Sequence, residues 1–185
     1  SYVEGAFTDT TYDDTAWGVP FQMQANCIGV YNQAIFEECG IDGWPETWTE
    51  LLEDCAKIKE AGYTPIAMGN KDQWLESAVV NTYAYKYIDQ DWFNSLANNE
   101  GAKFTDEKFV KALEGFQNIA QYFNEDMNSI NQDEMFALYY DKKAAMFFDG
   151  AWSVGTMIQN CPEDVLATTH VGLMPAVEGE SGTKY

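Results

Sequence analysis

The sequence predicts an α/β domain in which helices cover both faces of a sheet, and three observations support this. Short runs of β-forming residues alternate with segments of helical periodicity. These runs are continuously apolar, which is typical of strands buried on both faces. With 185 residues, 46% of them hydrophobic, the chain has the size and apolar content of one folded domain.

The charge of the chain limits its partners. Thirty acidic and ten basic residues give a formal net charge of -20. This charge repels phosphate backbones and anionic lipids, so we expect no nucleic acid partner and a neutral or cationic ligand. No run is long and apolar enough to span a membrane. Residues 1–14 are polar and acidic, unlike a targeting segment, so the protein is either cytosolic or trimmed at its ends.

The first predicted strand covers residues 17–31, which are rich in β-formers and follow the turn-prone Asp13 and Asp14. A short helix over 33–39 follows, and Gly40 ends it.

The next helix is the most strongly marked in the chain. Thr47 and Glu50 form a capping box, apolar residues then recur at helical spacing, and Gly62 supplies a left-handed stop. A buried strand is expected over 64–68, followed by a loop over 69–72 and a helix over 73–88.

The second half of the chain continues this alternation. We expect three helices here. The first covers residues 91–97, the second begins after a cap at Thr105, and the third covers residues 132–140. The helix after Thr105 has an apolar stripe that we assign to the core, made of Phe109, Leu113, Phe116, Ala120 and Phe123.

A buried strand over 144–148, a turn at Asp149-Gly150, a helix from Trp152 and a last strand over 170–174 complete the predicted elements. Ligands of α/β sheets bind outside the carboxyl ends of the strands. The loops at 69–74 and 149–152 both leave strand ends and are therefore candidate ligand loops.

Metal and cofactor sites are not indicated. The four cysteines contain no C-x-x-C pair, and with His170 as the single histidine they do not match zinc spacings. Disulfides and buried thiols both remain open, and we expect His170 to be a core or strand-end residue. Asn124, Asp126 and Asn128 begin like a calcium loop, but its required glycine and glutamate are absent. We expect no cofactor and no metal.

Three segments in this order resemble the extracellular solute-binding proteins of carbohydrate ABC importers, of the maltose-binding type. They are residues 18–41 (GVPFQMQANCIGVYNQAIFEECGI), residues 45–69 (PETWTELLEDCAKIKEAGYTPIAMG), and the combination of residues 143–146 (KAAM) with residues 149–152 (DGAW). Each is weak singly, but the set is specific and spans most of the chain.

The resemblance implies a type II periplasmic-binding-protein-like lobe, a three-layer α/β/α sandwich. Residues 1–19 would end a first lobe and approach the hinge, and residues 20–185 would form the second lobe, incomplete at both ends. The implied function is to bind a sugar or oligosaccharide between two lobes and deliver it to the permease subunits of the importer. The implied location is extracellular or periplasmic, as a lipoprotein whose membrane anchor lies outside this chain.

The resemblance also implies ligand-binding residues. Trp152 takes the place of a tryptophan that stacks on a sugar ring, and Asp149 would accept hydroxyl hydrogen bonds. Trp74 and Asp72 occupy a loop where the family places an aromatic and an acid. The competing interpretations are core packing for the tryptophans and a helix cap or a solvated surface for the acids.

Amides on the first strand supply the remaining candidates. Gln22, Gln24 and Asn26 alternate and would share one strand face, which suits a cleft better than a core. We choose Gln24 and Asn26 as ligand-binding residues. Structural or packing roles are expected for Tyr12 and for the other four tryptophans, Trp17, Trp44, Trp48 and Trp92.

Two other functions compete with this one. A glycoside hydrolase needs two carboxylates across a cleft, but in a chain with thirty acids a pair is no evidence. No nucleophile elbow, phosphate loop or zinc-protease motif occurs, so we expect no enzyme and no catalytic residue. A free-standing carbohydrate-binding module is the other alternative, and such modules are usually all-β.

Overall fold

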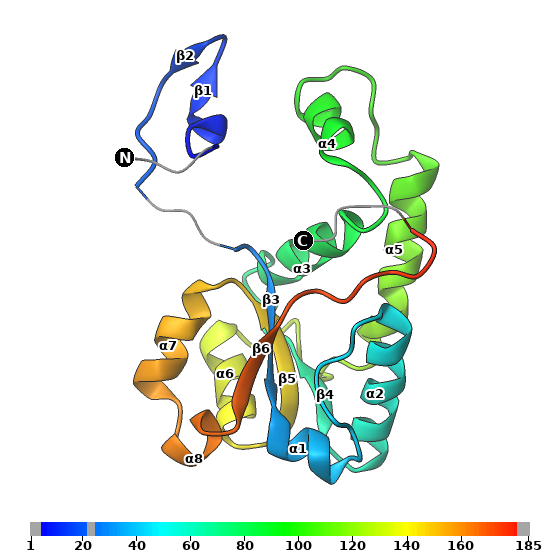
Figure 1. Cartoon of the computed structure of the whole chain (residues 1–185), viewed down its shortest axis with the longest axis vertical. Coiled ribbons are helices and arrows are strands. Elements are labelled where there is room, and N and C mark those ends of the chain that lie inside the picture. The colour runs from blue at the N-terminus through cyan, green and yellow to red at the C-terminus, as the bar shows by residue number, and fades with distance from the viewer. Residues whose placement is uncertain (1–4, 22–24, 181–185) are drawn as a thin grey trace.

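The computed structural model describes residues 5–21 and 25–180. Its centre is a four-stranded mixed sheet in the order β4-β5-β3-β6 (Figure 1). The strands are β3 (Ile28–Asn32), β4 (Thr64–Ala67), β5 (Ala144–Asp149) and β6 (Thr169–Gly172). β4 and β5 are parallel, whereas β3 is antiparallel to both β5 and β6. All six residues of β5 are buried, as its continuous apolar run predicts.

Helices cover both faces of this sheet (Figure 1). Phe147 of β5 packs against Phe136 and Tyr139, with ring centroids 5.4 and 5.1 Å away. Phe148 points to the other face and meets Trp44 at 5.8 Å. The helices are α1 (Gln33–Glu38), α2 (Trp48–Glu60), α3 (Leu75–Ala84), α4 (Gln90–Ala97), α5 (Glu107–Ala120), α6 (Gln132–Tyr140), α7 (Trp152–Asn160) and α8 (Glu163–Leu166). The predicted α/β class with a doubly covered sheet is confirmed.

Helix α2 begins and ends where its sequence predicts. The Thr47 hydroxyl accepts from the Glu50 backbone N–H at 3.2 Å, and the Glu50 carboxylate accepts from the Thr47 N–H at 3.0 Å. Gly62 adopts a φ of 93° just beyond the last turn, a conformation that costs glycine little.

The predicted long strand over 17–31 is wrong in extent, because only Ile28–Asn32 of it is a strand among the described residues. Trp17 is 77% exposed and Phe21 is 96% exposed. Pro20 cannot donate to a strand ladder, and Gly18 gains little from one. The β-forming composition of this segment is therefore not enough to make it a strand, because a strand also needs a partner to pair with.

The N-terminal part instead forms a small hairpin that stands apart from the sheet (Figure 1). After η1 (Thr8–Thr10), β1 (Thr11–Tyr12) pairs with β2 (Thr15–Ala16). Asp13 and Asp14 both have positive φ, 51° and 57°, as a two-residue primed hairpin turn requires. The Trp17 indole N–H donates to the Tyr12 carbonyl at 3.3 Å. The predicted turn is confirmed, and both aromatic residues belong to this hairpin.

Helix α5 differs from its prediction in its N-cap and in the residues of its buried stripe. Its N-cap is Asp106 rather than Thr105, and Leu113 is exposed, not in the core. The buried stripe consists of Phe109, Ala112, Phe116, Ile119 and Phe123, without Ala120. Helix α3 approaches α5 so closely at Gly115 that an added Cβ would lie 2.5 Å from the Tyr83 hydroxyl. This contact turns the buried face away from Leu113.

Smaller differences concern helix α3 and strand β6. Helix α3 is shorter than predicted at both ends and gives way to a hydrogen-bonded turn after Ala84. β6 begins at Thr169 and ends at Gly172, and His170 is exposed on it. His170 is not a core residue, because β6 is an edge strand with a neighbour on one side only.

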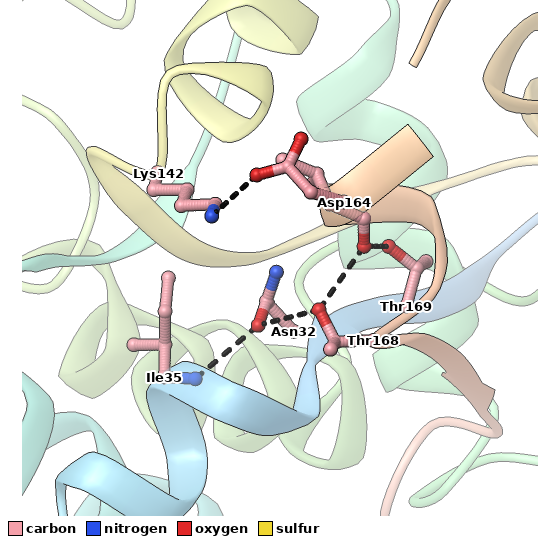
Figure 2. A network of polar contacts seen from close by, with 7 residues as sticks. Asn32, Ile35, Lys142, Asp164, Thr168 and Thr169 are labelled. Carbon is pink, nitrogen blue, oxygen red and sulfur yellow. Dashed lines mark hydrogen bonds and ion pairs between the residues drawn. The ribbon is translucent and has the colours of Figure 1, made fainter. Parts of the chain in front are cut away.

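A polar network joins β3, α1, α8 and β6 at the end of β3 (Figure 2). The buried Asn32 side-chain oxygen accepts from the Ile35 N–H and from the Thr168 hydroxyl, both at 3.2 Å. The Thr168 hydroxyl shares its one proton between Asn32 and the Val165 carbonyl, which lies at 3.1 Å, and the Thr169 hydroxyl donates to the same carbonyl at 2.8 Å. These bonds cap α1 and fix the crossing into β6, at the sheet edge opposite the candidate ligand loops.

Candidate functional site

Two loops meet at one edge of the sheet. Because β4 and β5 are parallel, their carboxyl ends lie at the same edge. The loop after β4 carries Trp74, and the loop after β5 leads into Trp152. The two indole rings have centroids 5.7 Å apart and an interplanar angle of 52°. The structure thus joins two of the predicted site residues in one aromatic pair.

Trp152 is held closely against the turn that precedes it. An added Cβ on Gly150 would lie 2.0 Å from the indole ring, so the ring covers the Gly150 backbone. The Ser153 hydroxyl donates to the Gly150 carbonyl at 2.8 Å, and the Ala151 N–H donates to the Ala25 carbonyl at 2.9 Å. Trp152 stays only half-buried, and the turn supports one side of its ring.

Asp149 lies beneath this turn and is fully buried. One carboxylate oxygen accepts from the Gly150 N–H at 2.7 Å, and the other accepts from the Gln132 side-chain amide at 2.6 Å. The nearby Trp152 side chain also lowers the pKa of this carboxyl. Burial raises the pKa of Asp149 from 3.8 to about 6, while these hydrogen bonds partly oppose the rise. The carboxylate therefore holds the Gly150 backbone and the Gln132 side chain in place.

The loop after β4 is fixed from within. The buried Asn70 amide donates to the Glu76 carboxylate at 2.8 Å and to the Asn128 side-chain oxygen at 2.9 Å. Trp74 is the N-cap of α3 and is 38% exposed. Asp72, also a predicted site residue, is exposed on the same loop. The loop therefore presents an aromatic ring and a carboxylate on a rigid base.

The predicted amides are placed only in part. Asn26 is exposed in the segment just before β3. It lies at the same sheet edge, because Ile28 pairs with Asp149. It is not on a strand, so the argument from alternation along a strand does not apply to it. Gln22 and Gln24 lie outside the described residues.

Sequence reasoning missed Gln132, the first residue of α6. In the sequence it is an ordinary polar residue at a helix start, and no local signal links it to Asp149. The link depends on the tertiary structure: α6 begins beside the loop after β4, and the end of β5 with Asp149 lies at the same sheet edge. An added Cβ on Gly69 would lie 2.3 Å from the Asn131 carbonyl oxygen.

Other site types find no support in the described part of the chain. No group of three or more His, Cys, Asp or Glu residues within 5–21 and 25–180 could hold a metal ion. All four cysteines, which lie within those ranges, are free thiols. Within the same ranges, every helix is too short or too polar to cross a membrane.

The sequence profile of the bacterial extracellular solute-binding proteins matches residues 1–183. An uncharacterized ABC transporter extracellular-binding protein of Pyrococcus horikoshii is 30% identical over 145 residues, which are 78% of this chain and 33% of that protein.

Two solved structures share the fold. One comes from work on xylan utilization by the thermophilic bacterium Caldanaerobius polysaccharolyticus (TM-score 0.86, 25% identity, 98% of this chain and 46% of that chain). The other is a chitin oligosaccharide binding protein (TM-score 0.81, 21% identity, 95% and 43%). The chain thus spans about a third of its curated relative and less than half of each solved chain.

Proposed function

The chain belongs to the bacterial extracellular solute-binding protein family, and from this premise we propose that it is the second lobe of the substrate-binding component of an ABC importer. Residues 1–19 would lead from a first lobe, and residues 20–185 would form the second. The component binds a sugar or oligosaccharide between the lobes and delivers it to the permease subunits. It acts outside the cell, held by a lipid anchor that lies outside this chain.

The family binds solutes without chemistry, so the chain is not an enzyme. This removes the glycoside hydrolase alternative. The helix-rich α/β fold removes the free-standing, usually all-β carbohydrate-binding module.

The Trp74–Trp152 pair is the observation that carries the proposal. A flat indole face matches the C–H face of a pyranose ring. Two indoles at an angle of 52° offer two such faces to neighbouring sugar units. Trp152 is the main stacking residue in this proposal, and Trp74 is the second.

Polar groups around the pair would bind sugar hydroxyls. Asp72 and Asn26 are both exposed, so a carboxylate and an amide are free to accept and donate hydrogen bonds. We also keep Gln24 in the proposed set. Asp149 is buried, so its contribution comes through the turn that it orders.

The net charge of -20 favours neutral sugars over anionic ones. One structural neighbour is a chitin oligosaccharide binding protein, and this supports an oligosaccharide as the ligand of this chain. A sugar binds tightly when the polar groups of both lobes form hydrogen bonds with it and are shielded from water. The first lobe, which would face this chain across the cleft, is therefore part of the site, and the complete protein is the sample to test.

Calorimetric titration of the complete protein with a panel of neutral oligosaccharides tests the proposal. At least one sugar should bind, and Trp152→Ala should weaken that binding at least about tenfold, or about 1.4 kcal/mol. Ile158→Ala changes a residue that is 67% exposed on the same helix and should leave the affinity unchanged. Absence of binding to every sugar in the panel would reject the proposal.

A further inference from the structure

A stacking tryptophan works only if its ring plane is held in place before the ligand arrives. Trp152 is held by the Gly150 backbone on one side and by the Trp74 ring at 5.7 Å. These two contacts restrict the ring sterically. The Gly150 N–H donates a hydrogen bond to Asp149 at 2.7 Å, so the backbone against which the ring packs is itself held by a directional bond.

The Asp149 carboxylate is itself fixed from two sides. The Gly150 N–H donates to one oxygen at 2.7 Å, and the Gln132 amide donates to the other at 2.6 Å. The bond from Gly150 is what a simple turn cap needs. The bond from Gln132 comes from another helix, and a turn cap does not require it.

Burying this carboxylate is costly. Asp149 is 0% exposed, and no lysine or histidine in the described part of the chain forms an ion pair with it. Buried carboxylates without a cation are destabilising unless hydrogen bonds compensate for lost hydration. Hydrogen bonds from the Gly150 N–H and the Gln132 amide converge on this one. An acceptor with two directed partners is useful where one of them, here the Gly150 backbone under the Trp152 ring, must keep its orientation.

Gln132 connects this cluster to the opposite loop. It is the first residue of α6, whose N-cap Asn131 accepts from the Glu134 N–H at 3.0 Å. The Asn131 carbonyl packs against Gly69, where the loop after β4 begins. The position of the Gln132 amide is therefore set by the loop that carries Trp74.

We infer that Gln132 and Asp149 are positioning residues, which fix the Trp152 ring against Trp74 and couple its orientation to the start of α6. The consequence for ligand affinity rests on the proposed function. The orientation of the ring itself does not.

The test measures the ring pair without a ligand. Two indoles at this distance couple their ultraviolet transitions and produce a paired positive and negative circular dichroism band. In the complete protein, the wild-type spectrum minus that of Trp74→Phe isolates this couplet. Gln132→Met removes the amide donor at similar length. Gln159→Met, on an exposed residue of α7, is the matched control.

We expect Gln132→Met to reduce the couplet to the level of Trp74→Phe, with helical content retained and Gln159→Met unchanged. If Gln132→Met does not fold, Gln132→Leu serves as the second variant, since its side chain is of comparable size and cannot donate. A couplet that persists in the folded variant overturns the inference, and so does a wild type without a couplet.

Sugar titration then separates the two proposals. With a sugar that binds the wild type, Gln132→Met should lower the affinity about tenfold. A lost couplet together with no sugar binding by the wild type supports the positioning role and rejects the proposed function. A lost couplet with unchanged sugar affinity shows that ring orientation does not govern binding, and this overturns the coupling to the ligand.

Discussion

Trp74 and Trp152 follow different strands of the sheet, yet their rings lie 5.7 Å apart at the edge where β4 and β5 end. The parallel pairing of the two strands places their loops together. The Gly150 backbone lies against the Trp152 ring, and Asn70 fixes the loop that carries Trp74. The predictions below follow from this arrangement.

Gly150→Ala should displace the Trp152 ring. The new methyl group would lie 2.0 Å from the indole, so the ring must rotate away from the turn. We expect sugar affinity to fall at least about tenfold, measured by calorimetry. Gly155→Ala is the matched control, because nothing lies within 4 Å of its Cβ. That change should stabilise α7 by about 0.5–1 kcal/mol and leave the affinity intact. Equal affinities for the two variants would contradict the proposed ring position.

Trp74→Ala should weaken sugar binding less than Trp152→Ala does. It removes one aromatic neighbour, worth about 0.5–1.5 kcal/mol, so we expect a loss of roughly two- to tenfold in calorimetric affinity. Trp92→Phe, in a half-buried ring stacked on Phe109, should leave the affinity unchanged. A larger loss for Trp74→Ala than for Trp152→Ala would reverse the assigned roles.

Asp149 should make stability depend on pH. Its folded-state pKa of about 6 lies above its ordinary value of 3.8, so the folded protein binds this proton more tightly than the unfolded chain does. The stabilisation is complete below about pH 4 and is lost as the pH rises through about 6. The neighbouring Cys27 thiol has a pKa raised to about 12 by burial and stays neutral over this range.

Urea unfolding of wild type and Asp149→Asn at several pH values measures this effect. Between about pH 4 and pH 7, the wild type should lose up to roughly 3 kcal/mol relative to Asp149→Asn. Asp72→Asn, at an exposed position, should follow the wild-type profile. Parallel profiles for wild type and Asp149→Asn would show that Asp149 does not titrate in this window.

Asn32→Ala should lower stability without changing binding. It removes the N-cap of α1 and the acceptor of the Thr168 hydroxyl at the end of β3 (Figure 2). We expect the free energy of unfolding to fall by about 1–2 kcal/mol in urea titrations. Asn118→Ala, at an exposed position on α5, should have little effect. A change in sugar affinity for Asn32→Ala would indicate that the two edges of the sheet are coupled.

The elements predicted correctly were those with local signals. The capping box at Thr47, the glycine stops at Gly40 and Gly62 and the apolar run of β5 are each encoded within a few residues. Their outcome does not depend on what lies nearby, so the sequence specifies them directly.

The misjudged features depend on tertiary neighbours. A strand over residues 17–31 needs a pairing partner, which composition does not reveal, and Trp17 is exposed instead. The buried face of α5 is set by the approach of Tyr83 at Gly115. Gln132 gains its role only because α6 starts beside the Asp149 turn. Of the predicted site residues, Trp74, Trp152, Asp149, Asp72 and Asn26 lie at one sheet edge, and their binding roles stay predictions.

The most direct test of sugar binding at this edge is a crystal structure of the complete protein with the tightest-binding oligosaccharide of the panel. The account predicts a pyranose ring stacked on Trp152 at about 4 Å, with Trp74 beside the next sugar unit and Asp149 still bonded to Gln132. A sugar bound elsewhere, with Trp152 making no contact to it, would contradict the account.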